Sequence, residues 1–260
     1  IISGTRLRNS EELYKEIPLT KVKVAPLHPR YPISSLFSLK FAKEISAKIK
    51  SAQIIHIHAA RDLISFYAAC ISRLCSKPYF IQTHGMIVQD NRKFVRFIDL
   101  ILTKRMLVKA NKVYYLNVSE LIQLQSMFKL DNMELLENGI QKCLDDPIIP
   151  ANFNIVFCSR IHPDKNISLF MQIVEEVLYL RPDIEFSIYG PDGGDLEKLV
   201  RHLSELKVSQ RVKYLGSLKN EEVLHVLRNA SCLVLPSSYD PFPMVVLESL
   251  SVGTPVLISS

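Results

Sequence analysis

The sequence lacks several features that mark whole classes of protein. Only 8 of its 260 residues are glycine, and 48% are hydrophobic against 22% charged, which excludes collagen-like, low-complexity and disordered chains. Its five cysteines form no Cys-x-x-Cys pair, so neither a disulfide scaffold nor a structural zinc site is expected. No apolar run reaches the ~18–20 residues that span a bilayer, and no basic start followed by an apolar stretch suggests a signal peptide. We therefore expect a soluble, cytoplasmic protein.

Several catalytic signatures are also missing. The sequence contains no His-Glu-x-x-His motif, no Ser-His-Asp arrangement and no P-loop, so hydrolases and kinases lack their residues here. No dense carboxylate cluster is present that would hold a hard metal ion. We expect neither a metal nor another cofactor.

Positive charge is concentrated in the first part of the chain. Residues 1–150 carry 22 Lys and Arg against 13 Asp and Glu, whereas residues 151–260 carry 10 against 13. The segment Asn91–Lys112 holds seven basic residues and one acid, Asp99. Its apolar residues recur at helical spacing: Phe94, Phe97, Ile98, Ile101, Leu102 and Leu107. The pattern predicts a basic amphipathic helix over Arg92–Ala110.

Three interpretations of this helix remain open. Its apolar stripe could face the core, with a solvated cationic back. Alternatively, the helix could lie on an anionic membrane surface, where each Lys or Arg contributes about 1 kcal/mol, as in a peripheral protein at the inner face of the cytoplasmic membrane. Nucleic acid ranks third, since no binding motif accompanies the charge, and we expect no nucleic acid partner.

Short β-branched runs alternate with longer amphipathic stretches along the whole sequence. This alternation predicts parallel sheets covered on both faces, the α/β class. The predicted strands are Lys21–Ala25, Gln53–His58, Tyr79–Thr83, Lys112–Leu116, Glu134–Leu136, Asn154–Ser159, Glu185–Tyr189, Arg211–Leu215, Cys232–Leu235 and Pro255–Ile258. The predicted helices, besides the basic one, are Leu36–Lys50, Leu63–Ser76, Ser119–Phe128, Ser168–Leu180, Leu196–Leu206, Glu221–Asn229 and Met244–Ser251.

A break in both patterns suggests where the chain divides. Gln141–Phe153 contains an Asp-Asp-Pro run and a second proline, which end regular structure. We expect two doubly wound domains facing a cleft, 1–145 and 146–260. We expect both domains to be incomplete, because no opening strand is predicted at Ile1 and the sequence stops at Ser260 directly after a buried-type strand. We therefore expect a fragment.

Loops after the predicted strands carry candidate ligand-binding residues. Arg160 and Lys165 share one loop, and a helix begins directly after them. This combination suits a diphosphate, because Arg offers a planar fork, Lys a mobile charge and a helix start free N–H groups. A solvated loop pair is the simpler interpretation of these two residues alone. The glycines of Gly190–Gly194 allow close backbone approach to a ligand, although a strand-to-helix turn explains them equally well.

The segment from Pro236 to Leu257 is the most informative. Pro243 stands where a first helical residue is expected, and Gly253 closes that helix before the next strand. Asp240 lies in the preceding turn. Glu248 lies inside an otherwise apolar helix, where burying an acid without a partner is costly. A structural ion pair would explain this acid, but a carboxylate that accepts two sugar hydroxyls is the better chemical use.

Together these motifs resemble the GT-B glycosyltransferases of family 4, which transfer sugars from nucleotide-sugar donors with retention. The most specific feature is the acid–seven residues–acid pattern from Asp240 to Glu248, followed by Ser249–Val256. Supporting matches are Arg160 with Lys165, the Gly190–Gly194 turn, Thr83-His84-Gly85 and Asn138-Gly139-Ile140. The sequence departs from the family at two positions, since the family usually has Glu where Asp240 stands and Gly where Pro243 stands.

The resemblance implies a role for each matched residue. Residues 1–145 would form the acceptor-side domain and residues 146–260 the nucleotide-sugar domain. The donor diphosphate would be held by Arg160, Lys165 and backbone N–H groups of Phe242, Met244 and Val245. The ribose and base would meet Glu248, Leu218 and Gly190. The catalytic residues, His84 and Asp240, would act at the transferred sugar.

The resemblance also implies the reaction. A UDP- or GDP-sugar would donate its sugar to a glycan or lipid-linked acceptor in bacterial cell-surface polysaccharide synthesis. Two alternatives stay open: a catalytically silent nucleotide-sugar-binding relative, and a nucleotide-sugar epimerase or phosphorylase of the same shape.

The histidines of the first half are weaker candidates. We expect His56 and His58, which alternate along a strand, to face opposite sides, one towards the cleft and one packed. His84 taken alone is more simply a structural histidine. Only the resemblance gives it a functional role.

Overall fold

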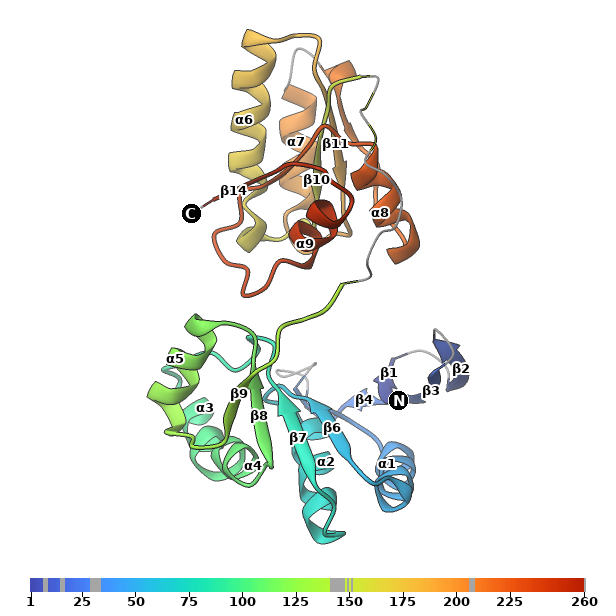
Figure 1. Ribbon diagram of the computed structural model, residues 1–260, viewed down its shortest axis with the longest axis vertical. Coiled ribbons are helices and arrows are strands. Elements are labelled where there is room, and N and C mark those ends of the chain that lie inside the picture. Colours follow the sequence, from blue (N-terminus) through green and yellow to red (C-terminus); the bar gives the residue numbers. More distant parts are fainter. Residues whose placement is uncertain are drawn as a thin grey trace. The chain divides into compact units, whose positions relative to one another are not determined.

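The chain folds into two compact units, Ile1–Glu137 and Asn138–Ser260 (Figure 1). The computed structural model describes residues 1–6, 9–14, 17–28, 34–140, 148, 150, 152–205 and 209–259. Most of the predicted linker, residues 141–147, 149 and 151, lies outside these described residues, as does the predicted division between residues 145 and 146.

The first unit is built on a parallel sheet of four strands in the order β6-β7-β8-β9. Its strands are β6 (Ile55–His58), β7 (Tyr79–Gln82), β8 (Lys112–Tyr115) and β9 (Met133–Leu135). Its regular α-helices are α1 (Leu39–Ser51), α2 (Leu63–Leu74), α3 (Lys93–Ile98), α4 (Lys104–Val108) and α5 (Val118–Phe128). Helices α1, α2 and α5 begin at side-chain caps, from Ser38, Asp62 and Asn117. The four predicted strands of this sheet are confirmed to within two residues at their ends.

The start of the chain corrects the expectation that no strand opens the first unit. Ile2–Thr5 forms β1, which pairs in parallel with β3 (Ile17–Lys23), and β3 pairs with β2 (Ser10–Tyr14) in an antiparallel manner. A short pair, β4 (Ala25–Pro26) and β5 (Leu36–Phe37), follows. The sequence signal was weak because β1, β3 and β4 expose several of their residues to water, so they lack the buried β-branched runs of the central sheets.

The predicted single helix over Arg92–Ala110 is interrupted. A π-helical turn, Asp99–Thr103, separates α3 from α4. Asp99, Thr103 and Leu107 are buried on the side of this segment that faces the protein. The Arg61 guanidinium donates two hydrogen bonds to the Asp99 carboxylate, at 2.7 and 2.9 Å. Phe94 and Phe97 are consequently 53% and 60% exposed. The core-facing interpretation of the apolar stripe is therefore wrong for these residues, because the buried polar pair rotates the segment.

The second unit is a five-stranded sheet in which every neighbouring pair is parallel, in the order β12-β11-β10-β13-β14. Its strands are β10 (Asn154–Cys158), β11 (Glu185–Tyr189), β12 (Val212–Tyr214), β13 (Cys232–Leu235) and β14 (Val256–Ile258). Its helices are α6 (Ile167–Leu180), α7 (Leu196–Glu205), α8 (Asn220–Arg228) and α9 (Met244–Ser251). The α/β class with parallel sheets is confirmed.

The strand order of the second unit marks one edge as the place for a ligand. The chain builds outward from β10 through β11 to β12, and then returns to the other side of β10 with β13 and β14. The order therefore reverses between β10 and β13. In open α/β sheets, ligands bind beyond the carboxyl ends of the strands at such a switch point.

Among the described helices, none combines the length and apolar character that crossing a membrane requires.

A buried carboxylate fixes the loop after β7 in the first unit. Glu120 is 4% exposed and accepts three hydrogen bonds, from Thr83 Oγ1 at 2.5 Å, Gly85 N at 2.6 Å and Leu116 N at 2.7 Å. Thr83 and Gly85 flank His84. Glu120 lies in the first turn of α5, so one side chain connects the ends of β7 and β8 with a helix start.

We predict that Glu120→Gln destabilises the chain by about 1–3 kcal/mol, because the amide would present N–H groups to donors that need an acceptor. Urea unfolding followed by circular dichroism measures the change. Glu134→Gln is the matched control, since Glu134 is 55% exposed and its partner Lys112 is also at the surface. An exposed pair of this kind should cost less than about 1 kcal/mol. Equal effects of the two substitutions would contradict the role of Glu120.

Candidate active site

Three loops of the second unit meet beyond the carboxyl ends of its central strands. The loop after β10 joins the loop after β11 through a parallel bridge between Ile161 and Asp192. It also joins the loop after β13, because Ser238 N donates to the Asp164 carbonyl at 2.8 Å. The loops that carry the predicted residues thus form one connected edge at the switch point.

An ion pair between Lys165 and Asp240 links two of these loops. The Lys165 Nζ donates to Asp240 Oδ2, and the two side chains are only 13% and 19% exposed. The other oxygen, Asp240 Oδ1, accepts from Phe242 N at 3.3 Å. The structure therefore brings together three predicted site residues, Lys165, Asp240 and Phe242. It pairs Lys165 with Asp240.

The Arg160 side chain packs against Gly193 in the loop after β11. A Cβ atom at Gly193 would stand 2.7 Å from Arg160 Cγ and 3.0 Å from its Cδ, so the absence of a side chain at Gly193 makes room for the arginine. Arg160 is exposed. Its guanidinium forms no ion pair with any acid in the described part of the chain. This cation is available to an anionic ligand.

Helix α9 begins where the loop after β13 ends. The helix starts at Met244, as predicted, but Pro243, expected as a first helical residue, occupies the N-cap position without a side-chain cap. The backbone N–H groups of Met244 and Val245 have no acceptor among the described residues, and Val246 N donates to the Pro243 carbonyl at 3.0 Å. Free N–H groups at a helix start attract anions.

Glu248 carries a half-buried carboxylate on α9 whose charge acts on Cys158 at the end of β10. Burial raises its pKa, and no hydrogen bond from a described residue reaches the carboxylate. Burial, and next to it the charge of Glu248, raises the pKa of the Cys158 thiol to about 11. Cys158 is the last residue of β10 and precedes Ser159 and Arg160. A half-buried carboxylate without a partner is costly, which suits a group that accepts hydrogen bonds from a ligand.

Gly190 has a packing role at the same edge. Its N–H donates to the Gly216 carbonyl at 2.8 Å, and its own carbonyl accepts from the Tyr214 hydroxyl at 2.8 Å. With φ at +149°, a Cβ atom here would fall 1.8 Å from the Ser159 carbonyl oxygen. The glycine lets β11 pass close to the end of β10. Leu218, also assigned to the nucleoside, packs half-buried against a hydrophobic cluster.

In the first unit, His84 is held in a strained turn beside another histidine. Its φ is +50°, in the left-handed region, and Gly85 follows at +68°. The His84 Nε2 lies 2.6 Å from His58 Nδ1. The rings of His56 and His58 stack with centroids 4.8 Å apart. The expectation that they face opposite sides is wrong, because side chains two residues apart on a strand share a face.

Glu120 is a positioning residue that our sequence analysis missed. A signal was available, since Asn117 and Glu120 have the spacing of an N-cap and the third helical residue, the capping-box pattern.

Among the described residues, no group of three or more His, Cys, Asp or Glu side chains could hold a metal ion.

We predict that His84 makes stability depend on pH. Burial lowers its pKa most, and the charge of His58 lowers it next; Glu120 raises it, and His56 adds a still smaller lowering. A histidine whose pKa is lowered on folding contributes fully above about pH 6.5, the unfolded value, and loses that contribution as the pH falls towards the folded value. His84→Asn should therefore reduce the loss of thermal stability between about pH 7 and 5, and Asn tolerates the left-handed backbone. His225→Asn is the control, because His225 is exposed on α8, and it should leave the pH dependence of thermal stability unchanged. A similar change in both variants would contradict the role of His84.

Comparisons with known proteins bear on the second unit most directly. Residues 145–260 match the family model for glycosyl transferases group 1. An uncharacterized glycosyltransferase of Methanocaldococcus jannaschii is 24% identical over 269 residues, which is 92% of this chain and 66% of the relative. The chain thus spans slightly less than two thirds of that protein.

Solved structures show the same fold. Anabaena HepE, crystallised with UDP and glucose, superposes with a TM-score of 0.70 at 15% identity, over 94% of this chain and 67% of its own. Sucrose-phosphate synthase from Thermosynechococcus elongatus gives a TM-score of 0.71 at 18% identity, over 96% of this chain and 67% of its own. The chain has the GT-B class of fold expected from its sequence, and its residues 145–260 are similar to the glycosyl transferases of group 1.

Proposed function

We propose that this protein transfers a sugar from a nucleoside-diphosphate sugar to a glycan or lipid-linked acceptor. The observation that carries the proposal is the connection of the loops at the switch point between β10 and β13, which carry Arg160, the Lys165–Asp240 pair and the start of α9. The match of residues 145–260 to group 1 glycosyl transferases supports it, because that match covers the unit that holds these residues. The UDP in the HepE structure supports a nucleoside diphosphate as the ligand class.

The diphosphate is the part of the donor that this edge suits best. When the bond between the sugar and the diphosphate breaks, negative charge grows on the leaving phosphate oxygens. Donors aimed at that charge lower the barrier, since they bind the transition state better than the ground state. In this proposal Arg160 supplies a planar fork, Lys165 a point charge, and the N–H groups of Met244 and Val245 a helix start.

The two acids take the sugar parts of the donor. Glu248 lacks a hydrogen-bond partner among the described residues, so two ribose hydroxyls would satisfy its carboxylate. Asp240 accepts from Lys165 and Phe242 and retains free lone pairs for a hydroxyl of the transferred sugar. Lys165 can donate to both the acid and a phosphate, because an ammonium has three hydrogens.

Other parts of the proposal rest on resemblance. These are retention of configuration, membership of family 4, a place in bacterial cell-surface polysaccharide synthesis, and the action of His84 at the reacting carbon. Nucleoside contacts by backbone near Leu218 and Gly190 also stay predictions. If the protein binds a nucleotide sugar without turning it over, it is a silent relative; if it changes the donor without an acceptor, it is an epimerase.

We predict that Arg160→Met lowers kcat/KM for sugar transfer roughly 10²–10³-fold, because one donor to the leaving diphosphate is lost. The substitution should leave folding intact, since the guanidinium is exposed. Sugar-dependent release of UDP or GDP by the full-length protein is the measurement, made with EDTA present because the cations in this proposal are the protein's own.

Arg201→Met serves as the matched control, since Arg201 lies exposed on α7 and belongs to no predicted site. It should retain full activity. Undiminished activity of Arg160→Met, or an equal loss in both variants, would contradict the assignment of the diphosphate to Arg160.

The basic segment of the first unit supports a second element of the proposal, contact with an anionic membrane surface. Phe94, Phe97 and Leu100 are 53%, 60% and 67% exposed, and they lie among seven Lys and Arg of residues 91–112. Exposed aromatic and aliphatic side chains between cations are typical of segments that lie in the headgroup region of a bilayer. This places the protein, in our proposal, at the inner face of the cytoplasmic membrane.

Sedimentation with vesicles tests this element. The protein should pellet with vesicles of phosphatidylglycerol and phosphatidylcholine, and pelleting should weaken as salt is raised, because surface charge attraction is screened. Phosphatidylcholine alone should bind little. Phe94→Gln with Phe97→Gln should reduce pelleting with anionic vesicles, since burial of two aromatic rings is lost. The absence of salt-sensitive binding would exclude the membrane role.

A further inference from the structure

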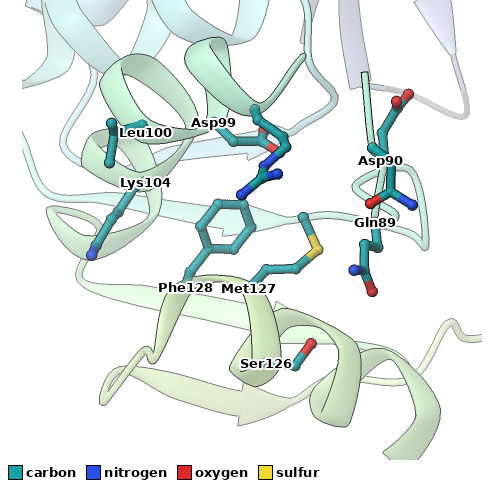
Figure 2. A pocket seen from close by; sticks show the side chains of 10 residues that line it. Gln89, Asp90, Asp99, Leu100, Lys104, Ser126, Met127 and Phe128 are labelled. Atoms are coloured by element: carbon teal, nitrogen blue, oxygen red, sulfur yellow. The ribbon is translucent and has the colours of Figure 1, made fainter. Parts of the chain in front are cut away.

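A hollow of about 480 Å³ opens in the first unit, and none of its lining residues belongs to the candidate active site (Figure 2). The loop before α3, the segment α3 to α4 and the end of α5 form its walls. The lining residues are Gln89, Asp90, Asn91, Arg96, Asp99, Leu100, Lys104, Ser126, Met127 and Phe128. Figure 2 shows Met127 and Phe128 extending from the end of α5 towards the helix that carries Leu100.

Both acids of the hollow are neutralised by arginines that do not line it. The Arg92 Nη2 lies 2.6 Å from Asp90 Oδ2, and this fork lowers the pKa of Asp90 to about 2. The Arg61 guanidinium holds Asp99 in bonds of 2.7 and 2.9 Å. These carboxylates are therefore committed and are not available as partners for the cations in the lining.

Two cations of the lining are not paired with these acids. Arg96 and Lys104 form no ion pair with any described residue, and both line the space. The side-chain amides of Gln89 and Asn91 add further donors at the opposite wall, and neither has a hydrogen-bond partner in the described ranges. An arginine fork, a lysine point charge and amide donors in one lining are the groups that bind phosphate in proteins.

The remaining wall is apolar. Phe128 is 4% exposed and Met127 is half-buried, and Leu100 stands 67% exposed at the rim. The π-helical turn Asp99–Thr103 contributes to this shape, because Asp99 is drawn inward to Arg61 while Leu100 is left outward. Single π-turns inside helices are frequent at functional sites.

We infer that this hollow binds a phosphate-bearing amphiphile. The phosphate would lie between Arg96 and Lys104, and the hydrocarbon portion would lie along Leu100, Met127 and Phe128. Since a free inorganic phosphate would leave the apolar wall unused, the occupant carries an apolar chain. The site is separate from the donor residues of the second unit, so the inference does not require glycosyl transfer. It rests on the proposed contact of the segment 91–112 with anionic lipid and deepens it, because Arg96, Leu100 and Lys104 belong to that segment.

Binding of decyl phosphate to the full-length protein, below the concentration at which it forms micelles, tests the inference by titration calorimetry. We expect decyl phosphate to bind, and both inorganic phosphate and the neutral decyl glucoside to bind at least about tenfold more weakly, since each lacks half of the recognised chemistry. The double variant Arg96→Gln with Lys104→Gln should weaken decyl phosphate binding about tenfold or more.

The double variant Arg105→Gln with Lys109→Gln is the matched control. It removes one arginine and one lysine from the same exposed segment, and neither residue lines the hollow. It should retain binding within about twofold. Leu100→Gln, at an exposed position that folding does not need, should weaken decyl phosphate binding and leave inorganic phosphate unaffected. Equal losses in both double variants, absence of binding, or equally tight binding of inorganic phosphate or decyl glucoside would overturn the inference.

Discussion

The ion pair between Lys165 and Asp240 is the contact on which the arrangement of the second unit's ligand edge depends. It joins residues 75 positions apart in sequence, one from the loop after β10 and one from the loop after β13. Both side chains are largely withdrawn from water, so each charge needs the other when no ligand is bound. The pair leaves Arg160 and Glu248 as the charged side chains of the predicted set that lack a partner in the part of the chain that the structure describes. A donor with both a diphosphate and hydroxyl groups would satisfy these two together.

Backbone packing brings these side chains to one edge. At Gly190 the chain passes so close to the Ser159 carbonyl that only glycine fits, and at Gly193 the missing side chain leaves room for Arg160. In the first unit a buried side chain has this role, because the Glu120 carboxylate accepts hydrogen bonds from the turn around His84 and so connects that turn to the start of α5. In both units a few tightly determined backbone positions orient side chains that would otherwise be mobile at loop ends.

The sequence predicts the regular parts of the fold well and their departures poorly. Helix α9 matches its expected bounds, Met244–Ser251, because proline before it and glycine after it restrict where a helix can run. The π-turn at Asp99 could not be found from apolar spacing, since a buried ion pair with Arg61 sets the orientation of that segment. The residues of the proposed donor edge were predicted from motifs and stay predictions, whereas the pairing of Lys165 with Asp240 depends on the strand order, which no local pattern contains.

Titration of the isotope-labelled protein with UDP, and separately with GDP, followed by backbone and side-chain NMR shifts, tests the central claim most directly. If Arg160, the N-terminus of α9 and Glu248 form one nucleotide site, one of these nucleotides will shift the signals of Arg160, Met244, Val245 and Glu248 together, with a single dissociation constant. Shifts confined to other surfaces, or different affinities reported by Arg160 and by Glu248, would contradict a shared site.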